Sequence, residues 1–362
     1  MKILILGDVC PTPHTDGLFA QKDMQSLFDN YPQTVAGHDF VVANLECAIT
    51  ESENRISKFG PNLKACRETA QVLKMLGVDC CGLSNNHIFD FGIEGYRDTV
   101  KALEDAGLAY TGFGENYADS RKNYYFEKEG KRICILAVCE HEYSYALDDR
   151  MGSRPFDPFE TLEDIRKAKQ EADRVIVLYH GGKELCRYPS PRLLKACRAM
   201  VKAGADLVTC QHSHCIGRYE NYEGGHILYG QGNFHFVKLF ADASDCWDTG
   251  LSISYDTEEN AVSFLPHRIT DTGITLAKGE EAAAILEEMA KRNASLQDGS
   301  WRTGWQTFCR ENSELYTRVI AGAMLPDSTP GKNHWFAHYL DCEAHQDVWR
   351  ELFPTANMTN EV

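Results

Sequence analysis

The sequence predicts an α/β fold, because short apolar segments alternate with amphipathic segments of helical periodicity. Runs rich in Val, Ile and Leu occupy residues 2–7, 40–46, 78–84, 132–138, 174–180 and 206–212. Segments with helical spacing lie between several of them, and each ends on a glycine that suits a helix C-terminus: residues 66–77, 94–107 and 191–204. Strands that alternate with helices of this length predict βαβ units with parallel pairing.

The pattern changes in the last third of the chain. Short strand-like segments at residues 226–236, 249–256 and 261–270 have no helix between them, which predicts antiparallel strands that complete a second sheet or an edge. Helical periodicity then dominates, so we expect a main domain over 1–277 and a C-terminal helical segment over 278–362.

Two histidines in the C-terminal segment have the i,i+4 spacing of a zinc-binding helix. His334 is followed by Trp335, however, where that motif requires Glu. A partly buried, aromatic-rich helix carrying His334 and His338 is the favoured interpretation.

Composition excludes some classes of function. A net charge of −16 without a basic stripe argues against nucleic-acid binding. Residues 1–6 are too few for a secretory leader and no later apolar run could span a bilayer, so we expect a cytoplasmic protein without a membrane segment. The fourteen cysteines lie in apolar runs without a Cys-x-x-Cys pair and are expected to be reduced core residues.

Polar side chains follow the ends of five predicted strands. They are Asp8, then Asn44 and Glu46, then Asn85, Asn86 and His87, then His180, and finally His212 and His214. The carboxyl ends of parallel strands share one edge of a sheet, which is where α/β proteins bind ligands. We therefore expect these side chains to meet at one rim.

Each of these residues alone has an ordinary explanation. Asp8 could stabilise a turn, Asn85 or Asn86 could cap a helix, and His180 could be a core histidine. Their joint occurrence at strand ends favours a site. Carboxylates, an amide and imidazoles suit two divalent ions such as Mn, Fe or Zn, which a bridging carboxylate holds roughly 3.5–4 Å apart. In an extended segment His212 and His214 would face one side, so each could bind one ion.

Six motifs resemble the CapA poly-γ-glutamate capsule-synthesis family of the calcineurin-like metallophosphatase superfamily. They are GD at 7–8, NLE at 44–46, NNHIFDFG at 85–92, HGGKE at 180–184, HSH at 212–214 and YGQGNF at 229–234. The resemblance extends over about residues 1–270. It implies a four-layer α/β/β/α sandwich of two mixed sheets, with the C-terminal helical appendage outside it.

The resemblance also implies roles for single residues. Asp8 and His214 correspond to ligands of the first metal, Glu46 to the bridging carboxylate, and Asn86, His180 and His212 to ligands of the second metal. His87 corresponds to a histidine that acts on the leaving group. Asp90 and Glu184 occupy positions that orient imidazoles or water.

The chain departs from the superfamily pattern at three positions, one of which is Gln211, where the usual Gly-His-x-His motif has a glycine. Cys10 stands where the first motif usually has a histidine, so the first metal is expected to bind more weakly unless the thiolate replaces that ligand. Gly181 replaces the aromatic residue that usually follows the third-motif histidine.

The leading functional prediction is a metal-dependent hydrolase with a binuclear site, acting on a phosphoester or a γ-glutamyl-type linkage of a small or oligomeric anionic substrate. Arg55, Lys58 and Lys183 lie in loops beside the motifs and could hold substrate anions, while Glu184, Glu140 and His141 could line the same crevice. The alternative is a non-catalytic, metal-bound scaffold or polymer-binding subunit. The presence of His87 favours catalysis, because a structural site needs no acid.

Overall fold

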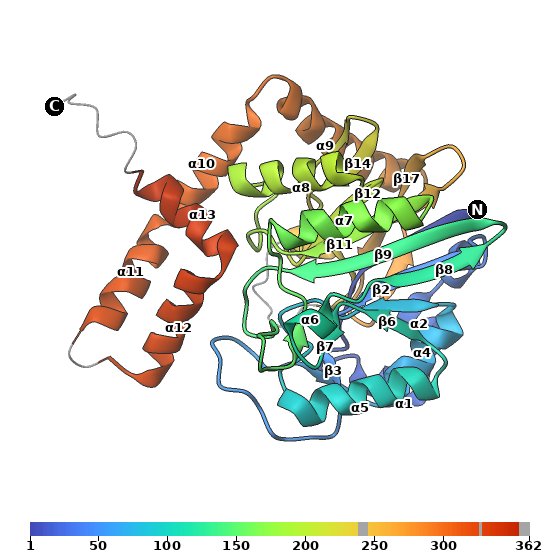
Figure 1. The fold of residues 1–362 in the computed structure, drawn as a ribbon, viewed down its shortest axis with the longest axis horizontal. Helices are drawn as coiled ribbons and strands as arrows, with labels where there is room; N and C mark the ends of the chain where they lie inside the picture. The colour runs from blue at the N-terminus through green and yellow to red at the C-terminus, as the bar shows by residue number, and fades with distance from the viewer. Residues whose placement is uncertain (238–244, 326–327, 355–362) are drawn as a thin grey trace.

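Two large mixed sheets pack face to face, and helices cover both outer faces (Figure 1). The computed structural model describes residues 1–237, 245–325 and 328–354. The expected α/β/β/α sandwich and the C-terminal helical appendage are both confirmed.

The first sheet combines a parallel and an antiparallel half. Its order is β18 (Ile274–Leu276), β17 (Ala261–Ile269), β16 (Thr249–Asp256), β1 (Lys2–Val9), β2 (Phe40–Leu45), β5 (Cys80–Gly82) and β6 (Ala109–Thr111), and β15 (Asn233–His235) pairs with the end of β1. The neighbouring strands β1, β2, β5 and β6 pair in parallel, whereas β1 pairs with β16, β16 with β17 and β17 with β18 in antiparallel fashion. The register places Asp8 beside Asn44.

The second sheet has a parallel centre. Its order is β13 (Tyr219–Tyr222), β14 (Gly225–Leu228), β12 (Leu207–Gln211), β11 (Arg174–His180), β9 (Lys131–Cys139) and β8 (Tyr124–Lys128), with antiparallel pairs at both edges. The strands that end in the predicted site residues therefore belong to two sheets. The expectation of a single sheet edge was wrong, because the two facing sheets both bring carboxyl ends to one rim.

Amphipathic helices bury their apolar faces on the two sheets. The first sheet is covered by α1 (Asp16–Gln21), α2 (Met24–Phe28), α4 (Glu68–Leu76) and α5 (Gly92–Asp105), and the second by α7 (Glu160–Glu171) and α8 (Pro191–Ala203). The shorter elements are α3 (Pro32–Val35), α6 (Tyr117–Ser120), β3 (Ala48–Ile49), β4 (Lys64–Ala65), β7 (Phe113–Gly114), β10 (Gly152–Ser153) and the 3₁₀ turn η1 (Asp245–Asp248).

Branched aliphatic side chains fill the layer between the sheets. Ile5 and Val42 from the first sheet meet Ile135, Ile176 and Leu178 from the second. All fourteen cysteines fall in the described ranges; none forms a disulfide and only Cys66 is not fully buried. Their expected role as small core residues is confirmed.

The C-terminal helices form a core of their own. They are α9 (Gly279–Gln297), α10 (Trp301–Glu311), α11 (Ser313–Met324), α12 (Pro330–Asp341) and α13 (Glu343–Leu352). Trp305, Tyr316, Tyr339 and Val348 pack together beside the sandwich, whereas Met289 of α9 enters the layer between the sheets. In the part of the chain that the structure describes, every helix is too short or too polar to cross a bilayer.

A buried ionic network joins α13 to the sandwich. Glu140, directly after β9, accepts hydrogen bonds from Tyr179 (2.9 Å) and from the backbone N–H of Ala344 at the start of α13 (3.1 Å). Arg192 bridges Glu140 (2.5 Å) and Asp347 of α13 (2.8 Å). Gly181 makes room for this network, because a Cβ there would lie 2.6 Å from the carboxyl carbon of Glu140.

Candidate metal centre

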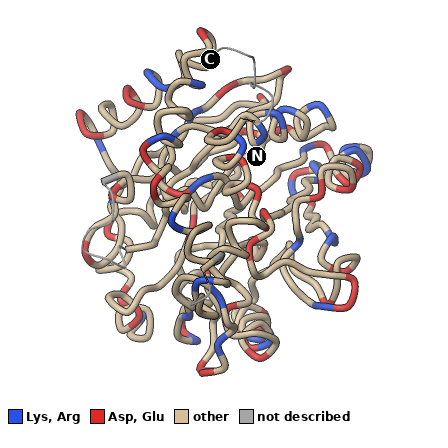
Figure 2. The backbone as a smooth tube through the Cα atoms, turned by 90° about the vertical axis from the view of Figure 1, so that its left-hand side faces the viewer, with Lys and Arg blue, Asp and Glu red and all other residues tan. Residues whose placement is uncertain are grey.

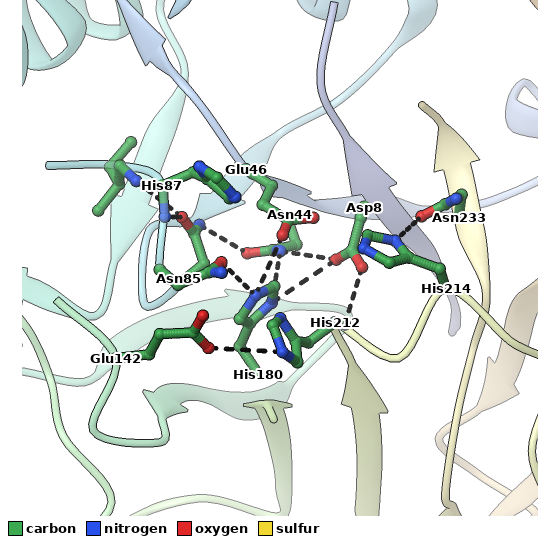
Figure 3. Close-up of polar contacts among 12 residues, drawn as sticks. Asp8, Asn44, Glu46, Asn85, His87, Glu142, His180, His212, His214 and Asn233 are labelled. Carbon is green, nitrogen blue, oxygen red and sulfur yellow. Dashed lines mark hydrogen bonds and ion pairs between the residues drawn. The ribbon is translucent and has the colours of Figure 1, made fainter. Parts of the chain in front are cut away.

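Three buried side chains from the two sheets meet at the rim (Figure 3). Glu46, directly after β2, His180, at the end of β11, and His212, directly after β12, each offer a ligand atom within 4.8 Å of the others. The Nε2 atom of His180 lies 3.3 Å from Glu46 Oε1 and 3.0 Å from Asn86 Oδ1. Four of the six predicted metal ligands are therefore brought together here.

Asp8 lies on the other edge of the His180 ring. Its Oδ1 atom is 3.8 Å from His180 Nδ1, and its Oδ2 atom accepts a hydrogen bond from the backbone N–H of His212 at 2.9 Å. Asn44, which sequence reasoning left without a role, donates to Asp8 at 2.7 Å and lies 3.2 Å from His180 Nδ1. Asn44 thus fixes the relative positions of Asp8 and His180.

The two histidines of the HSH motif point to different neighbours. His212 and His214 have φ values of 85° and 56°, so the segment is not extended and the argument that both would face one side was wrong. The Nδ1 atom of His214 is 2.8 Å from Asn233 Oδ1 and its ring stacks on Trp247, with centroids 3.9 Å apart. His214 lies outside the group of three, and its role as a metal ligand stays a prediction.

Burial makes the charged forms in this cluster costly. Burial and the neighbouring Glu46 raise the pKa of Asp8 to about 7. Burial, with Glu184 and Glu142, raises the pKa of Glu46 to about 8, although His212 and Lys58 oppose the shift. Burial lowers the pKa of His180 to about 3. His212 is the exception, because burial would lower its pKa but Glu142, Glu184 and Glu46 raise it overall.

Two buried polar atoms in the cluster have no hydrogen-bond partner among the described residues. They are Glu46 Oε2 and His212 Nδ1. Buried polar atoms without a partner are rare in folded proteins, and mixed oxygen and imidazole donors suit Mn, Fe or Zn. A divalent ion held by these residues would supply the missing contacts.

Cys10 does not join the donor set. Its sulfur lies 3.6 Å from the carbonyl oxygen of Pro11, and burial together with the adjacent Cys47 raises its pKa well above the usual range. A thiol held in this way does not replace the absent first-motif histidine.

His87, Asp90 and Lys58 form a second polar group beside the cluster. Asp90 Oδ2 lies 2.7 Å from His87 Nδ1 and accepts a hydrogen bond from the backbone N–H of Leu63, also at 2.7 Å. Lys58 forms an ion pair with the other oxygen of Asp90 and lies 3.1 Å from His87 Nδ1. Burial and Lys58 lower the pKa of His87, against the opposing effect of Asp90.

The remaining predicted residues are scattered. Arg55 is exposed and its guanidinium lies 3.5 Å from Glu53, away from the cluster. Lys183 and Glu184 lie 3.6 Å apart, and Glu184 affects the pKa of both His212 and His214. His141 faces Glu343 of α13 at 2.6 Å.

The C-terminal helices approach the cluster through Glu142, which sequence reasoning missed. Its two oxygens lie 3.4 Å from His212 Nε2 and 3.5 Å from His338 Nε2, and His338 in turn lies 3.1 Å from His345. The predicted partly buried helix of His338 is confirmed as α12. Glu142 and His338 lie almost 200 positions apart in the sequence, so their spacing could not predict that their side chains come close together.

The geometry agrees with a match to a known family. Residues 2–238 match the family described as "Bacterial capsule synthesis protein PGA_cap". The chain belongs to this family. The matched range contains Asp8, Glu46, His180 and His212, but ends before the C-terminal helices.

Two curated relatives extend this result. Capsule biosynthesis protein CapA of Bacillus anthracis is 30% identical over 274 residues, which cover 73% of this chain and 66% of the relative. PGA biosynthesis protein CapA of Bacillus subtilis (strain 168) is 29% identical over 235 residues, or 64% and 62% of the two chains. The chain thus spans slightly less than two thirds of each relative.

Among solved structures, a hypothetical protein from Thermus thermophilus shares 18% identity and a TM-score of 0.48, with 74% of this chain and 99% of that chain covered.

Proposed function

We propose that this PGA_cap protein is a metal-dependent hydrolase whose binuclear centre acts on a phosphoester or γ-glutamyl-type linkage of an anionic substrate. The observation that carries the proposal is the buried group of Glu46, His180 and His212, in which two polar atoms have no partner among the described residues. Asp8, Asn86 and His214 would complete the ligand set. The capsule-related names of the curated relatives support a substrate with many carboxylates.

The protein's own residues would hold the ions and deliver a proton to the leaving group. When bound, divalent ions supply Lewis acidity and lower the pKa of water. Asn44 would keep Asp8 and His180 in place through its short contacts to both. Asp90 would accept the Nδ1 proton of His87, which leaves Nε2 to carry the proton that the leaving group receives.

Charge placement favours Lys58 and Lys183 over Arg55 as contacts for substrate anions. Lys58 is held beside His87 by Asp90, and Lys183 lies beside Glu184 near the histidines. Arg55 would have to leave Glu53 to reach the cluster.

The test combines metal analysis with turnover. The full chain, loaded with Mn²⁺ or Zn²⁺, should hydrolyse p-nitrophenyl phosphate or γ-glutamyl-p-nitroanilide, and chelation should abolish this activity. The substitution His212→Gln should lower the metal content, whereas His87→Gln should keep it and reduce turnover of the anilide, whose amine leaving group needs a proton, about 10²- to 10⁴-fold. The loss on p-nitrophenyl phosphate should be smaller, because p-nitrophenolate is a good leaving group that needs less protonation. His14→Gln, at an exposed histidine, is the matched control.

Other outcomes would reject specific parts of the proposal. A metal-loaded protein without activity on either substrate class would favour the non-catalytic scaffold. Loss of metal from His87→Gln would make His87 a ligand and not an acid. Metal content that is unchanged in both His212→Gln and Glu46→Gln would remove the proposed centre.

A further inference from the structure

Arg218 is a second buried charged residue that lacks hydrogen-bond partners in the described part of the chain, and its charge is positive. Arg218 has no exposed surface, and its Nε, Nη1 and Nη2 atoms have no hydrogen-bond acceptor among the described residues. The ring of Tyr188 covers the guanidinium at 4.6 Å from its centroid. Aromatic contact offsets only part of the cost of burying a guanidinium, which normally requires paired acceptors.

Two further arginines line the same cavity of about 310 Å³. Arg187 comes from the loop after β11, Arg218 from the residue before β13, and Arg292 from α9. Within the described ranges none of the three forms an ion pair with a carboxylate, although Arg292 donates to the carbonyl oxygen of Gly217 at 3.3 Å. Three guanidinium groups from separate elements therefore converge on a cavity whose lining contains one carboxylate, that of Glu288.

The acidic residues at the cavity are already engaged. Glu288 forms an ion pair with Lys291 at 2.8 Å, and Asp298 accepts a hydrogen bond from the backbone N–H of Ser300, also at 2.8 Å. Burial and Arg292 together lower the pKa of Arg218 to about 10, against the opposing effects of Tyr188 and Asp298. The cavity keeps a net excess of positive charge in a protein whose total charge is −16.

This local excess does not belong to a basic face. Lys and Arg alternate with Asp and Glu over the side of the molecule that Figure 2 presents. Long-range steering by the whole protein would repel anions, so an anion would be held in the cavity by short contacts.

We infer that the cavity lined by Arg187, Arg218 and Arg292 binds a phosphate group, either free phosphate or the phosphoryl group of a small ligand. Guanidinium groups arriving from three directions match a tetrahedral dianion better than a planar carboxylate, which one arginine can satisfy in a bidentate manner. Its lining residues do not include Glu46, His180 or His212, so the site does not rest on the proposed hydrolase function.

The experiment is isothermal titration of the chelator-treated full chain with inorganic phosphate at constant ionic strength. We expect saturable binding that Arg187→Gln and Arg292→Gln each weaken roughly tenfold or more, because each removes charge-assisted hydrogen bonds. Arg218→Lys should weaken it as well, but the exposed Arg187 keeps the test valid if the buried substitution unfolds the chain. Arg166→Gln, at an exposed arginine of α7, should bind as the parent protein does.

Two control arms separate this site from its alternatives. His212→Gln should bind phosphate as the parent does, and citrate should bind more weakly than phosphate. The inference is overturned if phosphate does not bind saturably, if Arg187→Gln and Arg292→Gln bind normally, if only His212→Gln loses binding, or if citrate is preferred.

Discussion

Glu140 and Glu46 are both buried carboxylates that directly follow a strand, with 2% and 1% of their surfaces exposed, yet their surroundings differ. Glu140 receives hydrogen bonds from Tyr179, Arg192 and the backbone of Ala344. Among the residues that the structure describes, Glu46 keeps one oxygen without a partner and has only the His180 imidazole within ion-pair distance. The chain supplies a cationic partner, Arg192, to the first carboxylate, whereas the cation proposed for the second is a bound metal ion. The number of partners would then distinguish a structural buried charge from one that binds a ligand.

The largest expected effect on stability comes from removing Arg192 from the buried network that it forms with Glu140 and Asp347. Arg192→Met would leave Glu140 and Asp347 buried without their cation, so the free energy of unfolding should fall by about 3–5 kcal/mol. Urea denaturation monitored by circular dichroism measures this change. Arg166→Met removes an exposed ion pair and should behave as the parent protein does. Equal stability of the two variants would mean that the Glu140 network does not hold α13.

The substitution Glu46→Gln should instead raise the free energy of unfolding of the metal-free protein. An acid whose pKa rises from 4.5 to about 8 on folding destabilises the folded state progressively as pH increases between those values. The variant lacks this loss, so near pH 8 we expect it to be more stable than the parent by about 1–3 kcal/mol. Thermal melts from pH 5 to 8 with chelator present provide the measurement. With Mn²⁺ or Zn²⁺ added, the parent should instead gain the larger stabilisation, and a variant destabilised under both conditions would refute the comparison.

A half-buried pair should give a smaller, pH-dependent effect. Burial alone would lower the pKa of His141, but Glu343, Asp341 and Glu140 raise it overall. A histidine with a raised pKa adds stability below its unfolded value of 6.5, and this contribution disappears as pH rises through the folded pKa. His141→Gln should therefore lower the melting temperature at pH 5.5 by a few degrees and leave it unchanged at pH 9, unlike His14→Gln, which should be neutral at both.

The smallest effect is expected at an exposed pair. Arg55 and Glu53 have side chains that are 61% and 72% exposed, and such pairs contribute little because water screens them. Arg55→Gln should leave the melting temperature unchanged. The KM of Arg55→Gln for an anionic substrate is the sharper measurement. A severalfold increase would support the predicted role of Arg55 in substrate binding, and Lys58→Met provides the matched comparison.

The sequence was sufficient to predict the parallel βαβ core, and the strand ends that it singled out do bring Asp8, Glu46, His180 and His212 together, although from two facing sheets. The two sheets were implied only by the family resemblance, since strand order depends on long-range pairing that local patterns do not encode. The division of the chain at residues 277 and 278 stays a prediction. So does the ligand role of His214, whose left-handed backbone turns its ring toward Asn233.

Contacts made by the C-terminal helices were beyond prediction for a related reason. Glu142 and His338 each stand in a segment with an ordinary explanation, and only tertiary packing brings them within 3.5 Å. The arginine cavity is similar, because Arg187, Arg218 and Arg292 belong to no motif. A buried charge without a partner is a property of the folded chain and leaves no signature in sequence spacing.

The missing side chain at Gly181 has a consequence for the history of the family. A bulkier residue there would occupy the space of the Glu140 carboxyl group, which lies 2.6 Å from the position of a Cβ. Glu140 in turn accepts a hydrogen bond from the backbone N–H of Ala344, the second residue of α13, so the residue at 181 and the presence of this helix are not free to vary independently. Relatives with an aromatic residue at the equivalent position should lack the capped helix, and an exchange of C-terminal segments between the two kinds of protein should succeed only when this glycine is transferred as well.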